Sequence, residues 1–88
     1  MKVLKRNGSF QDFDLDKIKL SVERASDEAN EPFNTSDLEL LGKDIEHAIL
    51  NCGSDVIHAD DIKNIVAMTL MKLGFKKVAL YYNEHKKD

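Results

Sequence analysis

The sequence predicts a mainly helical α+β domain, a four-helix bundle with a β-hairpin over one end. Two observations lead to this fold class. Apolar residues recur every three or four positions in four separate segments, which is the period of an amphipathic helix. The start of the chain instead places short apolar stretches on both sides of Asn7-Gly8, the dipeptide most favoured in a two-residue type I′ hairpin turn. We therefore expect one domain, 1–88, with a hairpin cap, 1–13, and a helical bundle, 14–87.

Each strand of the hairpin is short. Residues 2–6 predict the first strand, in which Val3 and Leu4 are apolar, and residues 9–13 predict the second, in which Phe10 and Phe13 alternate imperfectly. An isolated hairpin is marginally stable in water. We therefore expect these four apolar side chains to lie against the helices.

The first two helices have clear starts. Asp14 or Asp16 can cap the first helix, and the segment 30–35 then breaks its pattern. Ser36 and Glu39 have the spacing of a capping box at the start of the second helix, which Gly53 ends. The predicted inner positions are Ile18, Val22, Ala25 and Ala29 in the first helix, and Leu38, Leu41, Ile45, Ala48 and Ile49 in the second.

The last two helices complete the predicted bundle. The third runs from about Ala59 to Leu73, with acidic residues in its first turn and Gly74 at its end. The fourth takes Lys76 to about Lys86. The predicted inner positions are Ile62, Ile65, Val66, Leu70 and Leu73, interrupted by Thr69, in the third helix, and Val78, Ala79, Tyr81 and Tyr82 in the fourth.

Composition excludes several classes of protein. The 88 residues are 33% charged and 42% hydrophobic and carry a formal net charge of -3, so the overall balance favours neither nucleic acid nor an anionic membrane as a partner. No apolar run approaches the roughly 20 residues of a membrane-spanning helix. The single cysteine, Cys52, excludes an internal disulfide framework and fits a reducing, cytoplasmic setting.

Common catalytic and metal-binding motifs are missing from the sequence. The four glycines are scattered, so there is no glycine-rich phosphate loop, and the three histidines lack the spacing of metal ligands. No periodicity ties Cys52 to a base. We expect neither catalysis nor a metal site built from the chain alone.

Basic residues gather near the N-terminus of this acidic chain. Lys5 and Arg6 are adjacent, Lys17 follows, and Lys19 and Arg24 extend the positive charge. Such a cluster indicates an anion-binding site. However, adjacent strand residues point to opposite faces, so Lys5 and Arg6 equally fit solvated charges on an edge strand. The pattern alone leaves both interpretations open.

The N-terminal block resembles a known family. The stretch Val3-Leu4-Lys5-Arg6-Asn7-Gly8, followed by Phe13-Asp14 and Asp16-Lys17-Ile18, resembles the opening signature of the ATP-cone, a small regulatory nucleotide-binding domain found at the N-terminus of many ribonucleotide reductases. Asp61-Ile62, Ile65-Val66 and the run 78–82 resemble the third and closing helices of that family. The resemblance covers nearly the whole chain and implies the same bundle and cap.

The resemblance also implies a ligand and its contacts. ATP or dATP, with Mg²⁺, would bind as an effector between the hairpin and the helices, and the domain itself would do no chemistry. The base would lie against Val3 and Ile18, and the run 11–17 would form the wall around it, with Gln11 and Asp14 near its edge. The phosphates or ribose would contact Lys5, Arg6 and Lys17, and Lys87 would close the phosphate end.

Three positions depart from the family pattern. Gln11 stands where an acidic residue is common, Ala59 where a hydroxyl residue often begins the third helix, and Lys63 where some members have a histidine. Ala59 therefore leaves one phosphate-facing hydroxyl missing. The charge of Lys63 can compensate for it if that side chain points inward.

The implied partner is a ribonucleotide reductase catalytic domain or subunit under allosteric control, with nucleotide-dependent self-association as a further expectation. Neither a membrane nor nucleic acid is expected as a partner. Transcriptional repressors also carry this domain, behind a cysteine-rich zinc ribbon that Cys52 alone cannot supply. The resemblance leaves open whether the chain is an excised domain or a stand-alone cone. The alternative function is a helical protein-interaction module without a nucleotide ligand.

Overall fold

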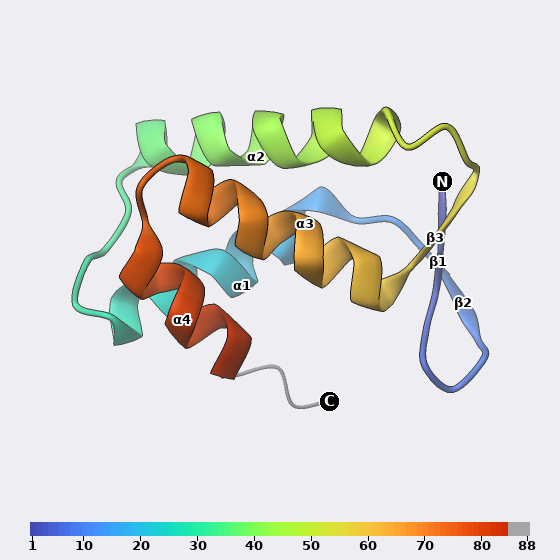
Figure 1. The fold of residues 1–88 in the computed structure, drawn as a ribbon, viewed down its shortest axis with the longest axis horizontal. Coiled ribbons are helices and arrows are strands. Elements are labelled where there is room, and N and C mark those ends of the chain that lie inside the picture. The colour runs from blue at the N-terminus through green and yellow to red at the C-terminus, as the bar shows by residue number, and fades with distance from the viewer. Residues whose placement is uncertain (85–88) are drawn as a thin grey trace.

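A computed structural model of the chain describes residues 1–84, which form four helices and three strands (Figure 1). Their order is β1 (Lys2–Leu4), β2 (Phe10–Asp12), α1 (Leu15–Glu28), α2 (Thr35–Leu50), β3 (Val56–His58), α3 (Ala59–Lys72) and α4 (Lys76–Glu84). The helices contain 14, 16, 14 and 9 residues, which is more than half of the chain. The predicted fold class is confirmed.

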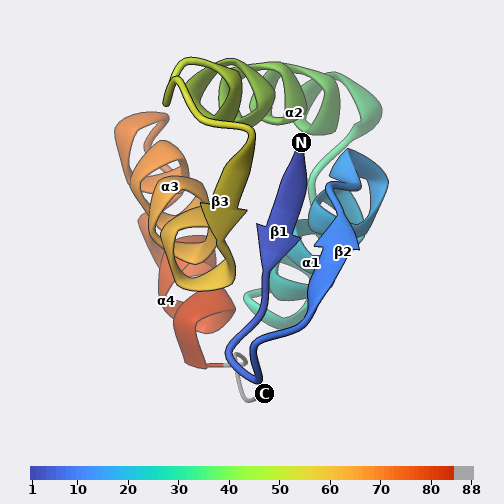
Figure 2. The same cartoon turned by 90° about the vertical axis from the view of Figure 1, so that its right-hand side faces the viewer.

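The helices surround one apolar core, and the small sheet lies across one end of it. Helices α1 and α3 each pack against both α2 and α4, so every helix has two helical neighbours. Figure 2 looks at the sheet from outside the bundle, with α2 along the top, α1 on one side and α3 and α4 on the other. The largest fully buried apolar side chains come from all four helices: Val22, Leu41, Ile45, Ile49, Val66, Leu70 and Val78.

Two polar or exposed positions interrupt the predicted stripes. Thr69 is buried, and its hydroxyl donates a hydrogen bond of 2.8 Å to the carbonyl oxygen of Ile65, which satisfies the polar group inside the helix. Ala48 was predicted to face inward and is exposed, so that part of the second stripe is wrong. The predicted end of the last helix, near Lys86, lies outside the described residues.

The sheet contains a strand that the sequence analysis missed. Strand β3 pairs in parallel with β1, and β2 pairs with β1 on its other side, antiparallel. Val3 of β1 stands opposite Ile57 of β3, and both side chains are buried. A three-residue strand is too short to show alternation. The predicted hairpin is thus one part of a three-stranded sheet.

The hairpin turn also differs from the prediction. The amide of Lys5 donates to the carbonyl of Ser9, and the amide of Gly8 donates to the carbonyl of Lys5. Gly8 has a φ of +87°, whereas Asn7 does not have a positive φ. The loop therefore has three residues, Arg6 to Gly8, with glycine in the left-handed position, in place of the two-residue type I′ turn. Strand β1 ends at Leu4, so Lys5 is the residue that precedes the loop and Arg6 is the first residue within it.

The inward face of the hairpin is smaller than predicted. Val3 faces the core, and Leu4 and Phe13 are half-buried. Phe10 is 60% exposed, contrary to expectation. Phe10 pairs with Leu4 across the ladder, and the next pair is Val3 with Gln11. Because neighbouring pairs point to opposite faces of a sheet and Val3 points inward, the side chain of Phe10 lies on the outer face.

Side-chain caps fix the helix starts next to the sheet. Asp14, one of the two predicted candidates, caps α1, and its carboxylate accepts a hydrogen bond of 3.0 Å from the amide of Asp16. His58 caps α3, because its Nδ1 accepts a hydrogen bond of 3.1 Å from the amide of Asp60. Both caps lie beside the cavities described below.

The cap of α2 lies elsewhere than predicted. The capping box consists of Asn34 and Asp37: the Asn34 side chain accepts from the Asp37 amide at 2.8 Å, and the Asp37 carboxylate accepts from the Asn34 amide at 3.3 Å. The predicted pair, Ser36 and Glu39, lies inside the helix. Asn and Ser are about equally good cap residues, so the sequence offered two competing starts.

Candidate functional site

Two adjoining cavities lie where the sheet meets α1, α3 and α4. The first, which we call the bundle cavity, has a volume of about 240 Å³, and the second, which we call the turn cavity, has a volume of about 390 Å³. They share three lining residues, Gln11, Ala59 and Lys63. A single elongated ligand can therefore extend from one cavity into the other.

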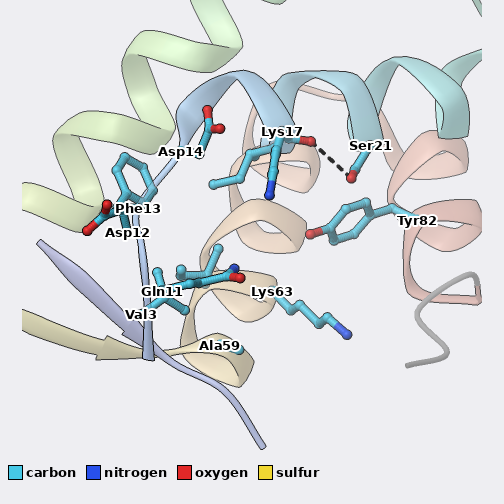
Figure 3. A pocket seen from close by; sticks show the side chains of 12 residues that line it. Val3, Gln11, Asp12, Phe13, Asp14, Lys17, Ser21, Ala59, Lys63 and Tyr82 are labelled. Carbon is cyan, nitrogen blue, oxygen red and sulfur yellow. Dashed lines mark hydrogen bonds between the residues drawn. The ribbon is translucent and has the colours of Figure 1, made fainter. Parts of the chain in front are cut away.

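The bundle cavity has apolar walls and a polar opening. Val3 from β1, Ile18 from α1 and Ile62 from α3 supply the walls. Figure 3 shows Lys17, Tyr82 and Lys63 on one side of the cavity, with Phe13 and Asp14 on the other. The remaining lining residues are Gln11, Asp12, Ser21 and Ala59. This combination suits a flat apolar ring system with hydrogen-bonding groups at its edge.

The turn cavity is cationic. Lys5 and Arg6 from the hairpin turn and Lys63 from α3 line it, together with one carboxylate, that of Asp60. Arg6 lies in the loop and not in a strand, so strand alternation does not turn it away from Lys5, and both residues line this cavity. An excess of positive charge in a small cavity attracts phosphate groups.

An ion pair joins the hairpin turn to α3 inside the turn cavity. The Nε of Arg6 donates a hydrogen bond of 2.9 Å to the carboxylate of Asp60, 54 residues further along the chain. This hydrogen bond from Arg6 lowers the pKa of the Asp60 carboxyl below its ordinary value. The Asp60 carboxylate thus holds the Arg6 guanidinium at the cavity. A phosphate group is also an anion and can take the place of this carboxylate as the partner of Arg6.

Tyr82 is a lining residue that the sequence assigned to the core. Its hydroxyl points into the bundle cavity (Figure 3), and burial raises the pKa of this hydroxyl from 10.0 to about 12. The side chain is therefore a neutral hydrogen-bonding group at physiological pH.

The raised pKa of Tyr82 predicts a loss of stability in alkali. The unfolded chain releases this proton near pH 10 and the folded chain near pH 12, so the free energy of unfolding falls as the pH rises between these values. An absorbance titration of phenolate should show one tyrosine that ionises near pH 12, and the Tyr82→Phe variant should lack this late step. A late step that persists in this variant would contradict the assignment.

The structure brings together nine of the ten residues that the sequence nominated. Seven line the bundle cavity: Val3, Gln11, Asp14, Lys17, Ile18, Ala59 and Lys63. Lys5 and Arg6 line the turn cavity. Lys17 lies in the bundle cavity, apart from these two cations. The tenth residue, Lys87, lies outside the described residues.

Other residues of the site were missed. Ile62 and Tyr82 belong to helical stripes that read as core, and periodicity cannot show that a stripe ends at a cavity. Asp60 was explained by its position at a helix start, and the sequence gives no sign of its pairing with Arg6. The same holds for Ser21, whose cavity contact depends on the packing of α1 against the sheet. Phe13 belongs to the run 11–17 that the resemblance placed around the base, and it lines the bundle cavity.

Other kinds of site have less support in the described part of the chain. Within residues 1–84, no group of three or more His, Cys, Asp and Glu side chains is placed to hold a metal ion. Cys52 is exposed, with a free thiol. Among these residues no helix combines the length and the apolar character needed to span a membrane.

Comparison with known proteins agrees with the geometry. The chain is 33% identical over 73 residues to the transcriptional repressor NrdR of Leifsonia xyli subsp. xyli (strain CTCB07). The match covers 83% of this chain and 45% of the repressor, so the chain spans less than half the length of that relative. The family model of the ATP cone domain matches residues 1–87. Since this match takes in nearly the whole sequence and the structure has the expected bundle and cap, the chain belongs to the ATP cone domain family.

Proposed function

We propose that this chain is a regulatory module that binds ATP or dATP and performs no chemistry itself. The observation that carries the proposal is the pair of adjoining cavities, one with apolar walls and one with cations, joined through Gln11, Ala59 and Lys63. A nucleoside triphosphate has the same division, with a flat base at one end and several negative charges at the other. Membership of the ATP cone domain family supports an adenine nucleotide as the ligand.

The base end of the nucleotide fits the bundle cavity. Val3, Ile18 and Ile62 would pack against the faces of the adenine ring. Gln11 lies on the same face of the sheet as Val3, its partner in the ladder, and its amide can both donate and accept a hydrogen bond. Gln11 and Asp14 would therefore read the edge of the base.

The phosphate end fits the turn cavity. Lys5, Arg6 and Lys63 would form charge-assisted hydrogen bonds with the phosphates. Lys17, at the neighbouring opening, would contact the ribose or the first phosphate. Mg²⁺ in nucleotide sites is usually held by phosphates and one or two carboxylates. Asp60 supplies the one carboxylate among the residues that line the turn cavity. Because the protein offers so few ligands there, the ion would be bound mainly through the triphosphate.

The occupied state would control a partner in the cytoplasm. A ribonucleotide reductase catalytic domain or subunit is one such partner, under allosteric control by the nucleotide. The similarity to a transcriptional repressor supports a second arrangement, in which the nucleotide controls a DNA-binding segment or the self-association of the chain. In both arrangements the ATP cone senses the nucleotide and another part of the assembly acts.

A calorimetric titration of the chain with ATP, dATP and GTP tests this function. We expect saturable binding of the adenine nucleotides. GTP should bind about fivefold more weakly, because guanine reverses the donor and acceptor pattern that Gln11 and Asp14 would read, at a cost of about 1 kcal/mol for one hydrogen bond.

Two results would go against this expectation. Equal affinity for GTP and ATP would contradict base recognition by Gln11 and Asp14. No heat of binding with any of the three nucleotides would favour the alternative of a protein-interaction module. The exposed apolar side chains of Met68 on α3 and Leu80 on α4 would then be available to a protein partner.

A further inference from the structure

The hydroxyl of Tyr82 faces the bundle cavity and is open to whatever fills it. Its residue lies on α4 and lines the bundle cavity, and none of residues 1–84 forms a hydrogen bond with this hydroxyl. The side chain is half-buried, and a hydroxyl that opens into a cavity pairs with water or with a ligand there. Because the hydroxyl points into the cavity (Figure 3), the group that would satisfy it is one that occupies the cavity.

The position of Tyr82 indicates which part of a nucleotide it faces. Tyr82 lines the bundle cavity and not the turn cavity, so its hydroxyl is away from the expected phosphate end. Within the bundle cavity it lies on the same side as Lys17 and Lys63, across from Phe13 (Figure 3). Lys63 also lines the turn cavity, so this side of the bundle cavity is the one that leads to the phosphates. The ribose, which links base and phosphates, must pass there.

We propose that the Tyr82 hydroxyl hydrogen-bonds to a ribose hydroxyl of the bound nucleotide and thereby sets the preference between ribonucleotide and deoxyribonucleotide. This proposal rests on the proposed function, because it assumes that an adenine nucleotide occupies the two cavities. It adds the residue that distinguishes ATP from its deoxy forms, a role that neither the sequence pattern nor the family match assigns.

The chemistry of the phenol suits this role. A neutral tyrosine hydroxyl can both donate and accept, as can a ribose hydroxyl. A site that is built to bind a substrate hydroxyl rejects the analogue without it, because the buried partner is then left unpaired. Phenylalanine at this position removes the partner, and the deoxy analogue then loses its disadvantage.

The test compares the chain with its Tyr82→Phe variant against ATP, 2′-deoxy-ATP and 3′-deoxy-ATP in calorimetric titrations. We expect the variant to bind ATP about fivefold to tenfold more weakly. We also expect one of the two deoxy analogues to bind both proteins equally, within twofold, because it lacks the hydroxyl that Tyr82 contacts. The melting temperature should stay the same, since the aromatic ring remains.

The matched control is Tyr81→Phe. Tyr81 is the neighbouring half-buried tyrosine of α4, and it does not line either cavity. This variant should bind all three ligands as the unmodified chain does. If Tyr81→Phe changed the ratio between ATP and the deoxy analogues as strongly as Tyr82→Phe, the effect would come from the packing of α4 and the proposal would be wrong.

Other outcomes separate this proposal from the proposed function. Equal weakening of ATP and both deoxy analogues would mean that Tyr82 contacts the base, and unchanged binding of all three would mean that it contacts no part of the ligand. Either result overturns the ribose contact while nucleotide binding stands. If the unmodified chain bound none of the three ligands, the proposed function and this proposal would both fail.

Discussion

Replacing Arg6 with alanine is expected to weaken ATP binding by about tenfold to hundredfold and to leave the melting temperature unchanged. A charge-assisted hydrogen bond to phosphate contributes about 1.5–3 kcal/mol, and each 1.4 kcal/mol is a factor of ten in affinity. Arg6 is exposed in the turn and contributes nothing to the core, so the fold should persist. Lys5→Ala and Lys17→Ala should act in the same direction. Calorimetry and thermal melting measure the two quantities.

The loss at Arg6 should be the largest of the three because of Asp60. Without the guanidinium, the Asp60 carboxylate remains in the turn cavity and repels the phosphates. The double variant Arg6→Ala with Asp60→Asn should therefore bind ATP better than Arg6→Ala alone. The control is Lys43→Ala, which removes an exposed positive charge on α2 that lines neither cavity. If Arg6, Lys5 and Lys17 variants all bound ATP as well as this control does, the cations would be solvated charges.

Leu41→Ala is expected to lower the free energy of unfolding by about 2–5 kcal/mol. Leu41 is 1% exposed in the middle of the helical core, and its truncation removes apolar contacts and leaves a cavity. This is a large part of the total for a small domain, which is about 5–15 kcal/mol. Urea denaturation followed by circular dichroism measures the change.

The adjacent residue provides the matched control for this substitution. Leu40 lies on the same helix and is 53% exposed, so Leu40→Ala should change the free energy of unfolding by no more than about 0.5 kcal/mol. A similar loss for both variants would contradict the role of burial, because alanine is the better helix former and propensity alone would not lower the stability of either variant.

The sequence by itself determined the helices and indicated that the ligand is an anion. Helical periodicity and caps depend on residues within a few positions of one another, so Val22, Leu41 and Leu70 could be placed in the core before the structure was known. The gathering of Lys5, Arg6 and Lys17 indicated an anion for the same local reason. Even here, equivalent cap residues such as Asn34 and Ser36 left the start of α2 undecided.

Only the tertiary structure decided how the site is assembled. Strand β3 is too short for a local signal, and it pairs with β1 across more than half of the sequence. The contacts of Asp60 with Arg6, and of Tyr82 with the bundle cavity, likewise join segments that are distant along the chain. The physical reason is that such contacts depend on the packing of whole helices against the sheet, whereas a sequence pattern reports only the face that each residue occupies on its own element.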